Sequence, residues 1–159
     1  MTQEHGAVQQ WLARLGAATG LDGLQLDDNG CLALRYGEGL ELMLELPEGS
    51  PVAHLYAPVL QLGGDEAGLL ATFRRLLALN LFALETQGAT FALDEMHQRI
   101  VLQYPLVVQA TDAGLFERVL GNFIETARRW QAQLASGAAE PGPPPFAEPP
   151  PLGAMMLRI

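Results

Sequence analysis

The side chains that could do chemistry in this 159-residue chain are few and lie far apart in the sequence. The three histidines, His5, His54 and His97, fall on three different predicted elements, and none has a second ligand at the spacing of a zinc site. Cys31, the only cysteine, has no His or Lys near it in the sequence to lower its pKa. Ser50 lies in a predicted loop, outside any G-x-S-x-G context. We therefore expect no catalytic residue, no metal site and no cofactor-binding site.

Pairs of carboxylates are the remaining candidates for acid–base chemistry or for a hard metal ion. Two pairs adjoin predicted turns, where Asp side chains usually bond the local backbone, and the third faces outward on an alternating strand. The pairs are Asp27–Asp28, Asp94–Glu95 and Glu41/Glu45. We interpret them as solvated acids, and on residues alone the chain is a binding or structural module.

The overall charge excludes further classes of function. The chain has 18 acidic and 9 basic residues, a net charge of −9, so its surface repels nucleic-acid phosphates and anionic membranes. A single cysteine allows no intrachain disulfide, which favours a reducing compartment. The N-terminal residues lack a secretory signal pattern, and no apolar run approaches the ~20 residues of a spanning helix. We expect a soluble cytoplasmic protein with no nucleic-acid or membrane partner.

Hydrophobic periodicity predicts a helix and then strands in the first half of the chain. The helically spaced apolar residues are Val8, Trp11, Leu12 and Leu15. Gly20 is expected to end this helix. Alternation then predicts strands in LQLDD, CLALRY, LELMLEL and VAHLYAPVL, with a hairpin turn at Asn29-Gly30. Pro58 cannot donate to a ladder, so we expect it at an edge or a bulge.

The second half predicts helix, two strands and helix. Asp65 caps a helix from about residue 66 to 82, two strands flank a polar connection at 95–98, and Thr111 or Asp112 caps the last helix. The order α-β-β-β-α-β-β-α predicts an α+β sandwich, with helices packed on a twisted, mostly antiparallel sheet. We expect one domain over residues 1–135. Residues 136–159 hold seven of the eleven prolines and predict a Pro-rich flexible tail.

The second predicted helix contains an unusual apolar run, LLALNLFAL. Eight of its nine positions are apolar, and Asn80 is the exception. A helix without a polar face must be covered on every side, and one sheet covers only one side. A second copy of the chain is the simplest cover for the other side. The predicted dimer interface comprises Leu70, Leu77, Asn80, Leu81, Phe82 and Leu84. Asn80 is either a satisfied structural residue or a polar contact that fixes the register across the two-fold axis.

Several segments, taken in order, resemble a known family. LLALN, TQGATFALDE, RIVLQYPL and FIETARRWQAQL, together with the helix and strands upstream, are similar to the class I type III secretion chaperones, the Tir chaperone (CesT) family. The resemblance covers about residues 8–134, and the Pro-rich tail and the link at 85–89 depart from it. It implies a homodimer, built largely on the second helix, that binds the N-terminal region of a secreted effector. It also implies the secretion ATPase as a further partner and requires no ATP or other cofactor in the chain itself.

We expect the effector segment to lie across the first helix and the strands that follow it. Candidate contacts are Leu26, Leu34, Tyr36, Leu42 and Leu44, although sequence does not separate groove residues from core residues in this set. Two alternatives stay open. One is a YbjN-like regulatory or scaffold domain of the same fold. The other is an enzyme or small-ligand protein with a sheet pocket lined by Tyr36, Tyr56 and His54.

Overall fold

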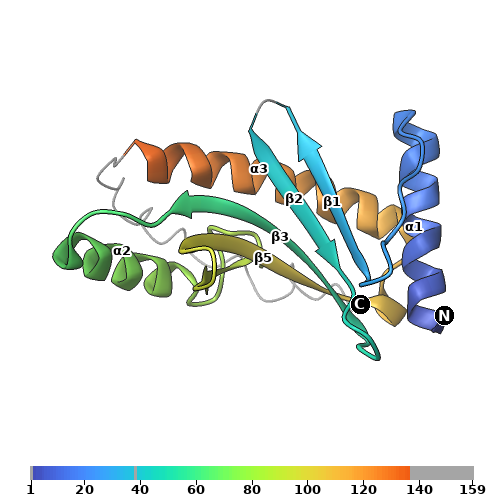
Figure 1. Cartoon of the computed structure of the whole chain (residues 1–159), viewed down its shortest axis with the longest axis horizontal. Helices are drawn as coiled ribbons and strands as arrows, with labels where there is room; N and C mark the ends of the chain where they lie inside the picture. The colour runs from blue at the N-terminus through green and yellow to red at the C-terminus, as the bar shows by residue number, and fades with distance from the viewer. Residues whose placement is uncertain (1, 38, 137–159) are drawn as a thin grey trace, which may run out of the picture.

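A five-stranded antiparallel sheet, with strand order β1-β2-β3-β5-β4, organises the chain (Figure 1). The computed structural model describes residues 2–37 and 39–136. The elements are α1 (Gln3–Thr19), β1 (Cys31–Tyr36), β2 (Leu40–Glu45), β3 (Val52–Gln61), α2 (Glu66–Leu79), β4 (Thr90–Asp94), β5 (Arg99–Val107), the 3-10 helix η1 (Val108–Ala110) and α3 (Ala113–Ala135). The predicted α+β order is confirmed. The segment predicted as a Pro-rich tail lies, from residue 137 on, outside the described residues.

The ends of the helices follow the capping signals in the sequence. The Asp65 carboxylate accepts a hydrogen bond from the Gly68 amide at 2.8 Å, and Asp112 accepts from Leu115 at 2.7 Å. Gly20 ends α1 in the left-handed conformation, with φ 73°. No helix in the described part of the chain is long and apolar enough to cross a membrane.

The predicted strand LQLDD is wrong. Residues 24–27 form no strand, because the Asp27 side chain bonds the backbone that follows it: its carboxylate accepts from the amides of Asn29 at 2.9 Å and Cys31 at 2.8 Å. Gly30 then takes φ 77°, and a Cβ there would lie 2.3 Å from the carbonyl oxygen of Leu46. The Asn-Gly signal therefore marks a tight entry into β1, not a hairpin between two strands.

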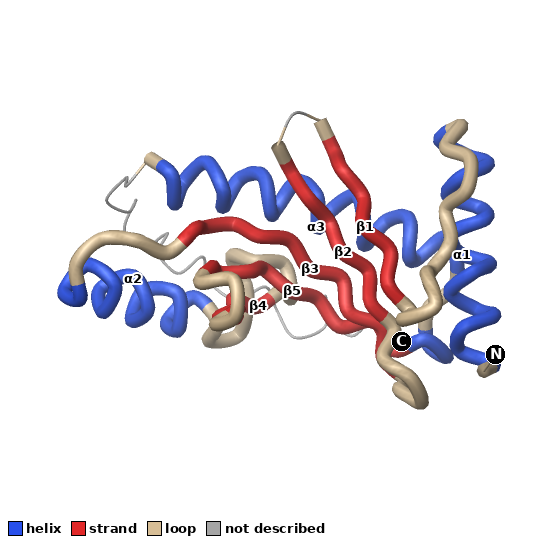
Figure 2. Tube along the Cα trace, in the orientation of Figure 1, coloured by secondary structure: helices blue, strands red, loops and turns tan. Residues whose placement is uncertain are grey.

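Pro58 was expected at an edge strand or at a bulge, and the structure shows the bulge but not the edge strand. It lies in β3, an inner strand, not an edge strand, but the register with β5 does shift between Pro58 and Leu60 as a bulge requires. β2 pairs with β3 only over Met43–Glu45, and the β1–β2 pair fans away from β3 beyond that point (Figure 2). Gln131 of α3 donates to the Pro58 carbonyl at 3.0 Å. A strand position that cannot donate is thus tolerated where β2 has already diverged.

The core lies between one face of the sheet and the helices. Alternate residues of β2 and β3 fill it, as the alternating pattern predicted: Leu40, Leu42, Leu44, Ala53, Leu55 and Ala57 are all buried. Trp11 of α1 stacks on Phe116 of α3 with ring centroids 5.2 Å apart. Trp130 meets Phe91 of β4 edge-to-face at 5.1 Å. α1 and α2 lie at opposite ends of the sheet (Figure 1).

Residues 62–98, which contain α2 and the edge strand β4, connect the end of β3 to the start of β5, and the two ends of this segment lie next to each other. The Leu62 amide donates to the Gln98 carbonyl at 2.9 Å, and the Gln61 side chain donates to the carbonyls of His97 and Gln98. β3 and β5, on either side of this excursion, pair directly along most of their lengths.

Candidate binding surfaces

Five of the ten large apolar side chains that are exposed among the described residues lie on α2 and in the turn after it. Exposure of these residues ranges from 57% at Leu70 to 81% at Leu84, and the set, which we call the α2 patch, is Leu70, Leu77, Leu81, Phe82 and Leu84. Leu76 is the one residue of α2 that is fully buried. Exposed apolar patches of this kind mark interaction sites. These residues are five of the six predicted for the dimer interface, and their contact with a second copy stays a prediction.

The expectation that α2 continues to about Phe82 is wrong, and Asn80 gives the reason. The helix ends at Leu79, and the Asn80 side chain then binds the backbone of Phe91 on β4 with both ends of its amide: it donates to the carbonyl at 3.0 Å and accepts from the amide at 2.7 Å. These bonds satisfy Asn80 inside its own chain. They favour the structural role over a polar contact across a two-fold axis.

The turn after Asn80 has a strained backbone, which hydrogen bonds from neighbouring side chains hold in place. Phe82 and Ala83 both take left-handed backbone conformations, with φ 64° and 48°, which cost non-glycine residues roughly 1–2 kcal/mol each. The buried Thr86 hydroxyl bonds to the carbonyls of Ala83 and Ala89, and Arg129 of α3 donates to the Glu85 carbonyl. Such conformations persist only where the surroundings fix them. Here they hold the Phe82 ring out toward solvent.

The predicted effector-binding residues divide into core and surface. Leu26, Leu42 and Leu44 belong to the core part of the predicted set, because they are buried within this chain. Leu34 is half-buried, and Tyr36, at the end of β1, is 48% exposed. The Arg128 guanidinium of α3 lies 5.8 Å from the centroid of the Tyr36 ring, a contact that no sequence pattern announces.

The pocket proposed for an enzyme or small-ligand protein is not assembled. Tyr36 pairs with Leu40 and so shares the helix-covered face of the sheet, whereas Tyr56 pairs with Met43 on the other face, which it shares with His54. The Tyr56 hydroxyl instead donates to Glu45 at 3.4 Å, and burial, reinforced by that carboxylate, raises the pKa of Tyr56.

Cys31 is half-buried and poorly suited to act as a nucleophile. Burial raises the pKa of its thiol, and the carboxylates of Glu45 and Asp27 raise it further, so the thiol is protonated at neutral pH. The described residues contain no group of three or more His, Cys, Asp and Glu side chains arranged to hold a metal ion.

Asp94 forms the most connected charged cluster, at the β4–β5 turn. Its carboxylate accepts from Arg99 Nε at 2.8 Å and lies 2.8 Å from His97 Nδ1. The hydrogen bond from Arg99 is the main reason that the pKa of Asp94 is below its ordinary value. All three residues serve the turn that joins two strands, so we assign the cluster a structural role.

The profile of the Tir chaperone protein (CesT) family matches residues 10–131. The chain belongs to this family. As a CesT-family member it is a type III secretion chaperone, as the resemblance in its sequence implied. No curated protein sequence matches the chain.

Solved structures agree with the CesT assignment. The chain superposes on a chain of the ExsC-ExsE complex with a TM-score of 0.72 and 25% sequence identity, covering 84% of this chain and 97% of that one. A chain of the HopA1-SchA chaperone–effector complex matches with a TM-score of 0.68 and 16% identity, covering 83% and 98%. The ExoU-SpcU complex from the type III secretion system of Pseudomonas aeruginosa matches at 0.57 and 21%, covering 81% and 95%. The last two likenesses show the fold alone.

Proposed function

We propose that this chain is a homodimeric chaperone of the bacterial cytoplasm that binds the non-globular N-terminal segment of a secreted effector. It keeps that segment soluble and secretion-competent and carries out no reaction of its own. The family match over residues 10–131 carries the proposal. The likeness to a chain of the HopA1-SchA chaperone–effector complex supports it.

The α2 patch supports the homodimer. Burying a large apolar side chain stabilises by about 1.5–3 kcal/mol, and a two-fold contact buries each residue of the patch twice. The net charge of −9 keeps a chain with such a patch in solution before it meets its partner copy. Asn80 is already satisfied by Phe91, so the contact rests on the five apolar side chains.

The opposite end of the sheet supports client binding. β1 is an edge strand, so beyond Cys31, whose amide and carbonyl are bonded to Asp27, the outward row of its backbone groups can pair with an extended polypeptide. Leu34 is half-buried and Tyr36 exposed on this strand, and α1 lies beside it (Figure 1). A dimer formed through α2 leaves this surface free on both copies, so one client chain has two surfaces to cross.

The test combines oligomeric state with client capture. We expect light scattering to show a dimer at micromolar concentration for the native chain and a folded monomer for Leu77→Asp. Val107→Asp is the matched control, since Val107 is comparably exposed but lies outside the α2 patch, and it should stay dimeric. A native chain that is monomeric under these conditions would exclude the homodimer.

Client capture is measured by co-expression with the first hundred or so residues of an effector encoded in the same bacterium. We expect two chaperone chains per client and hydrogen-exchange protection on α1 and β1. If no unfolded polypeptide copurifies, and the protein holds a small molecule instead, the chaperone proposal is wrong.

A further inference from the structure

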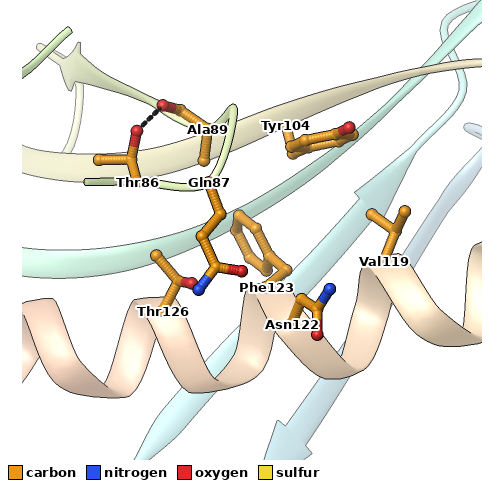
Figure 3. Close-up of a pocket in the computed structure, with 8 residues that line it drawn as sticks. All are labelled: Thr86, Gln87, Ala89, Tyr104, Val119, Asn122, Phe123 and Thr126. Atoms are coloured by element: carbon orange, nitrogen blue, oxygen red, sulfur yellow. Dashed lines mark hydrogen bonds between the residues drawn. The ribbon is translucent and has the colours of Figure 1, made fainter. Parts of the chain in front are cut away.

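A small cavity opens between α3, β5 and the segment that enters β4 (Figure 3). Its volume is about 70 Å³, and the residues that define it are Gln87, Tyr104, Val119, Asn122, Phe123 and Thr126. None of the side chains that line it is charged. None of its lining residues belongs to the α2 patch or to β1.

Thr126 lines the cavity and carries a buried hydroxyl group that has no hydrogen-bond partner among the described residues. The residue is 2% exposed. The helix threonines Thr19 and Thr72 behave differently: each donates to the carbonyl four residues before it, at 2.7 Å and 2.9 Å. A buried hydroxyl without a partner is costly. The Thr126 hydroxyl can therefore bond a polar group that enters the cavity.

The mouth and walls restrict what that group can be. Gln87 and Asn122 line the cavity and are exposed to solvent, and each amide offers both a donor and an acceptor, the two groups that a peptide bond requires (Figure 3). The rings of Tyr104 and Phe123 make flat apolar walls. Gly88 lets the chain pass close to the Tyr104 ring, because a Cβ there would lie 3.2 Å from it. A charged side chain would lose its hydration here without gaining an opposite charge.

We propose that this cavity anchors one short, uncharged polar side chain, an Asn, Ser or Thr, from an extended segment of the client polypeptide. The Thr126 hydroxyl bonds the tip of the anchor, and the amides of Gln87 and Asn122 bond the client backbone on either side of it. This inference rests on the proposed function, since it names a contact of the same client. This contact lets the chaperone select among client sequences by hydrogen bonding as well as by the burial of apolar side chains.

The first test needs no client. Acetamide, which is the side chain of Asn as a free molecule, is titrated into the full-length chain while the methyl resonances of Ala89, Val119 and Thr126 are followed by NMR. We expect saturable shifts with a Kd of roughly millimolar order, given how few atoms the probe has. Thr126→Val, which keeps the shape and removes the hydroxyl, should weaken binding at least several-fold, and Thr126→Ser should retain it. Shifts that do not saturate mean that only water enters the cavity, and saturable shifts that are equal in Thr126→Val mean that the hydroxyl holds no ligand; either result overturns the proposal.

The second test uses the effector segment from the co-expression experiment. We expect Thr126→Val to weaken its binding about tenfold, the loss of one hydrogen bond to a buried group, and Asn122→Ala to weaken it less. Thr72→Val is the matched control and should leave the affinity unchanged, because the Thr72 hydroxyl bonds only its own helix. The proposal fails if Thr126→Val raises the melting temperature but leaves client affinity unchanged. It also fails if this variant weakens the dimer instead, since the anchor would then belong to the second copy. A chain that binds no client at all refutes the proposed function, and the acetamide titration still decides whether the cavity is a polar site.

Discussion

α2 and α3 are both capped by an aspartate, but they meet very different surroundings. α3 buries a full stripe inside its own chain: Phe116, Leu120, Phe123, Thr126, Ala127 and Trp130. α2 fully buries Leu76 and leaves Leu70 and Leu77 largely exposed. α3 runs along the sheet behind β1 and β2, whereas α2 lies beside the end of β3 (Figures 1 and 2). The comparison indicates that the place of a helix on the sheet, more than its number of apolar residues, decides whether those residues are all buried within one chain.

The largest contrast should appear when each helix loses one apolar side chain. Phe116→Ala is expected to lower the free energy of unfolding by about 3–5 kcal/mol, because Phe116 is 1% exposed and stacks on Trp11. Leu77→Ala should change it little at concentrations where the chain is monomeric and should instead weaken the dimer. Urea denaturation at several protein concentrations measures both effects. A large cost of Leu77→Ala that does not depend on concentration would contradict the contrast between the helices.

A smaller effect is expected where α2 ends. Asn80→Ala leaves both the amide and the carbonyl of Phe91 without their partner, so we expect a loss of about 1–3 kcal/mol in unfolding free energy. Asn122→Ala on the exposed side of α3 is the matched control and should be close to neutral. Equal effects of the two substitutions would show that Asn80 does not fix the end of α2. Thermal and urea unfolding of the two variants, side by side, decide this.

The smallest effect concerns the turn between β4 and β5, and it depends on pH. The pKa of Asp94 is lowered from its ordinary value of 3.8, chiefly by the bond from Arg99. The charged carboxylate therefore stabilises the fold fully above pH 3.8, and this contribution is lost as the pH falls through the lower, folded-state pKa. Asp94→Asn should lower the melting temperature slightly at pH 7, and the difference from the native chain should shrink below pH 3.8. A difference that stays constant with pH would mean that the charge of Asp94 is unimportant.

Sequence periodicity was enough to predict most of the fold. The alternation of Leu40, Leu42 and Leu44 and the aspartate caps are local signals, and the structure follows them. The failures come from interactions between distant residues. The apolar run through Phe82 predicted more helix, but the bonds from Asn80 to Phe91 end the helix at Leu79. That competition is invisible in a window of neighbouring residues.

The binding surfaces were predictable only in part. The apolar run without a polar face contains side chains that a single chain leaves exposed, such as Leu77 and Phe82, and their contact with a second copy stays a prediction. The alternating strands gave no means to separate Leu42, which is core, from Tyr36, which is exposed, because both lie on the same face of the sheet. Thr126 was missed altogether, since a hydroxyl on the buried side of a helix carries no signal until the cavity beside it is known.

The adjacency of Leu62 and Gln98 has a consequence for how such chaperones diversify. Because β3 ends and β5 begins at neighbouring points, α2 and the edge strand β4 have the connectivity of a cassette inserted between two strands that already pair. Segments whose ends meet are the ones that proteins exchange most readily. In the proposed dimer, exchange of this segment would change the contact between subunits and, through Gln87, the proposed anchor for the client, while β1 and α1 would stay as they are. Pairing between unlike subunits could then arise by a single recombination event.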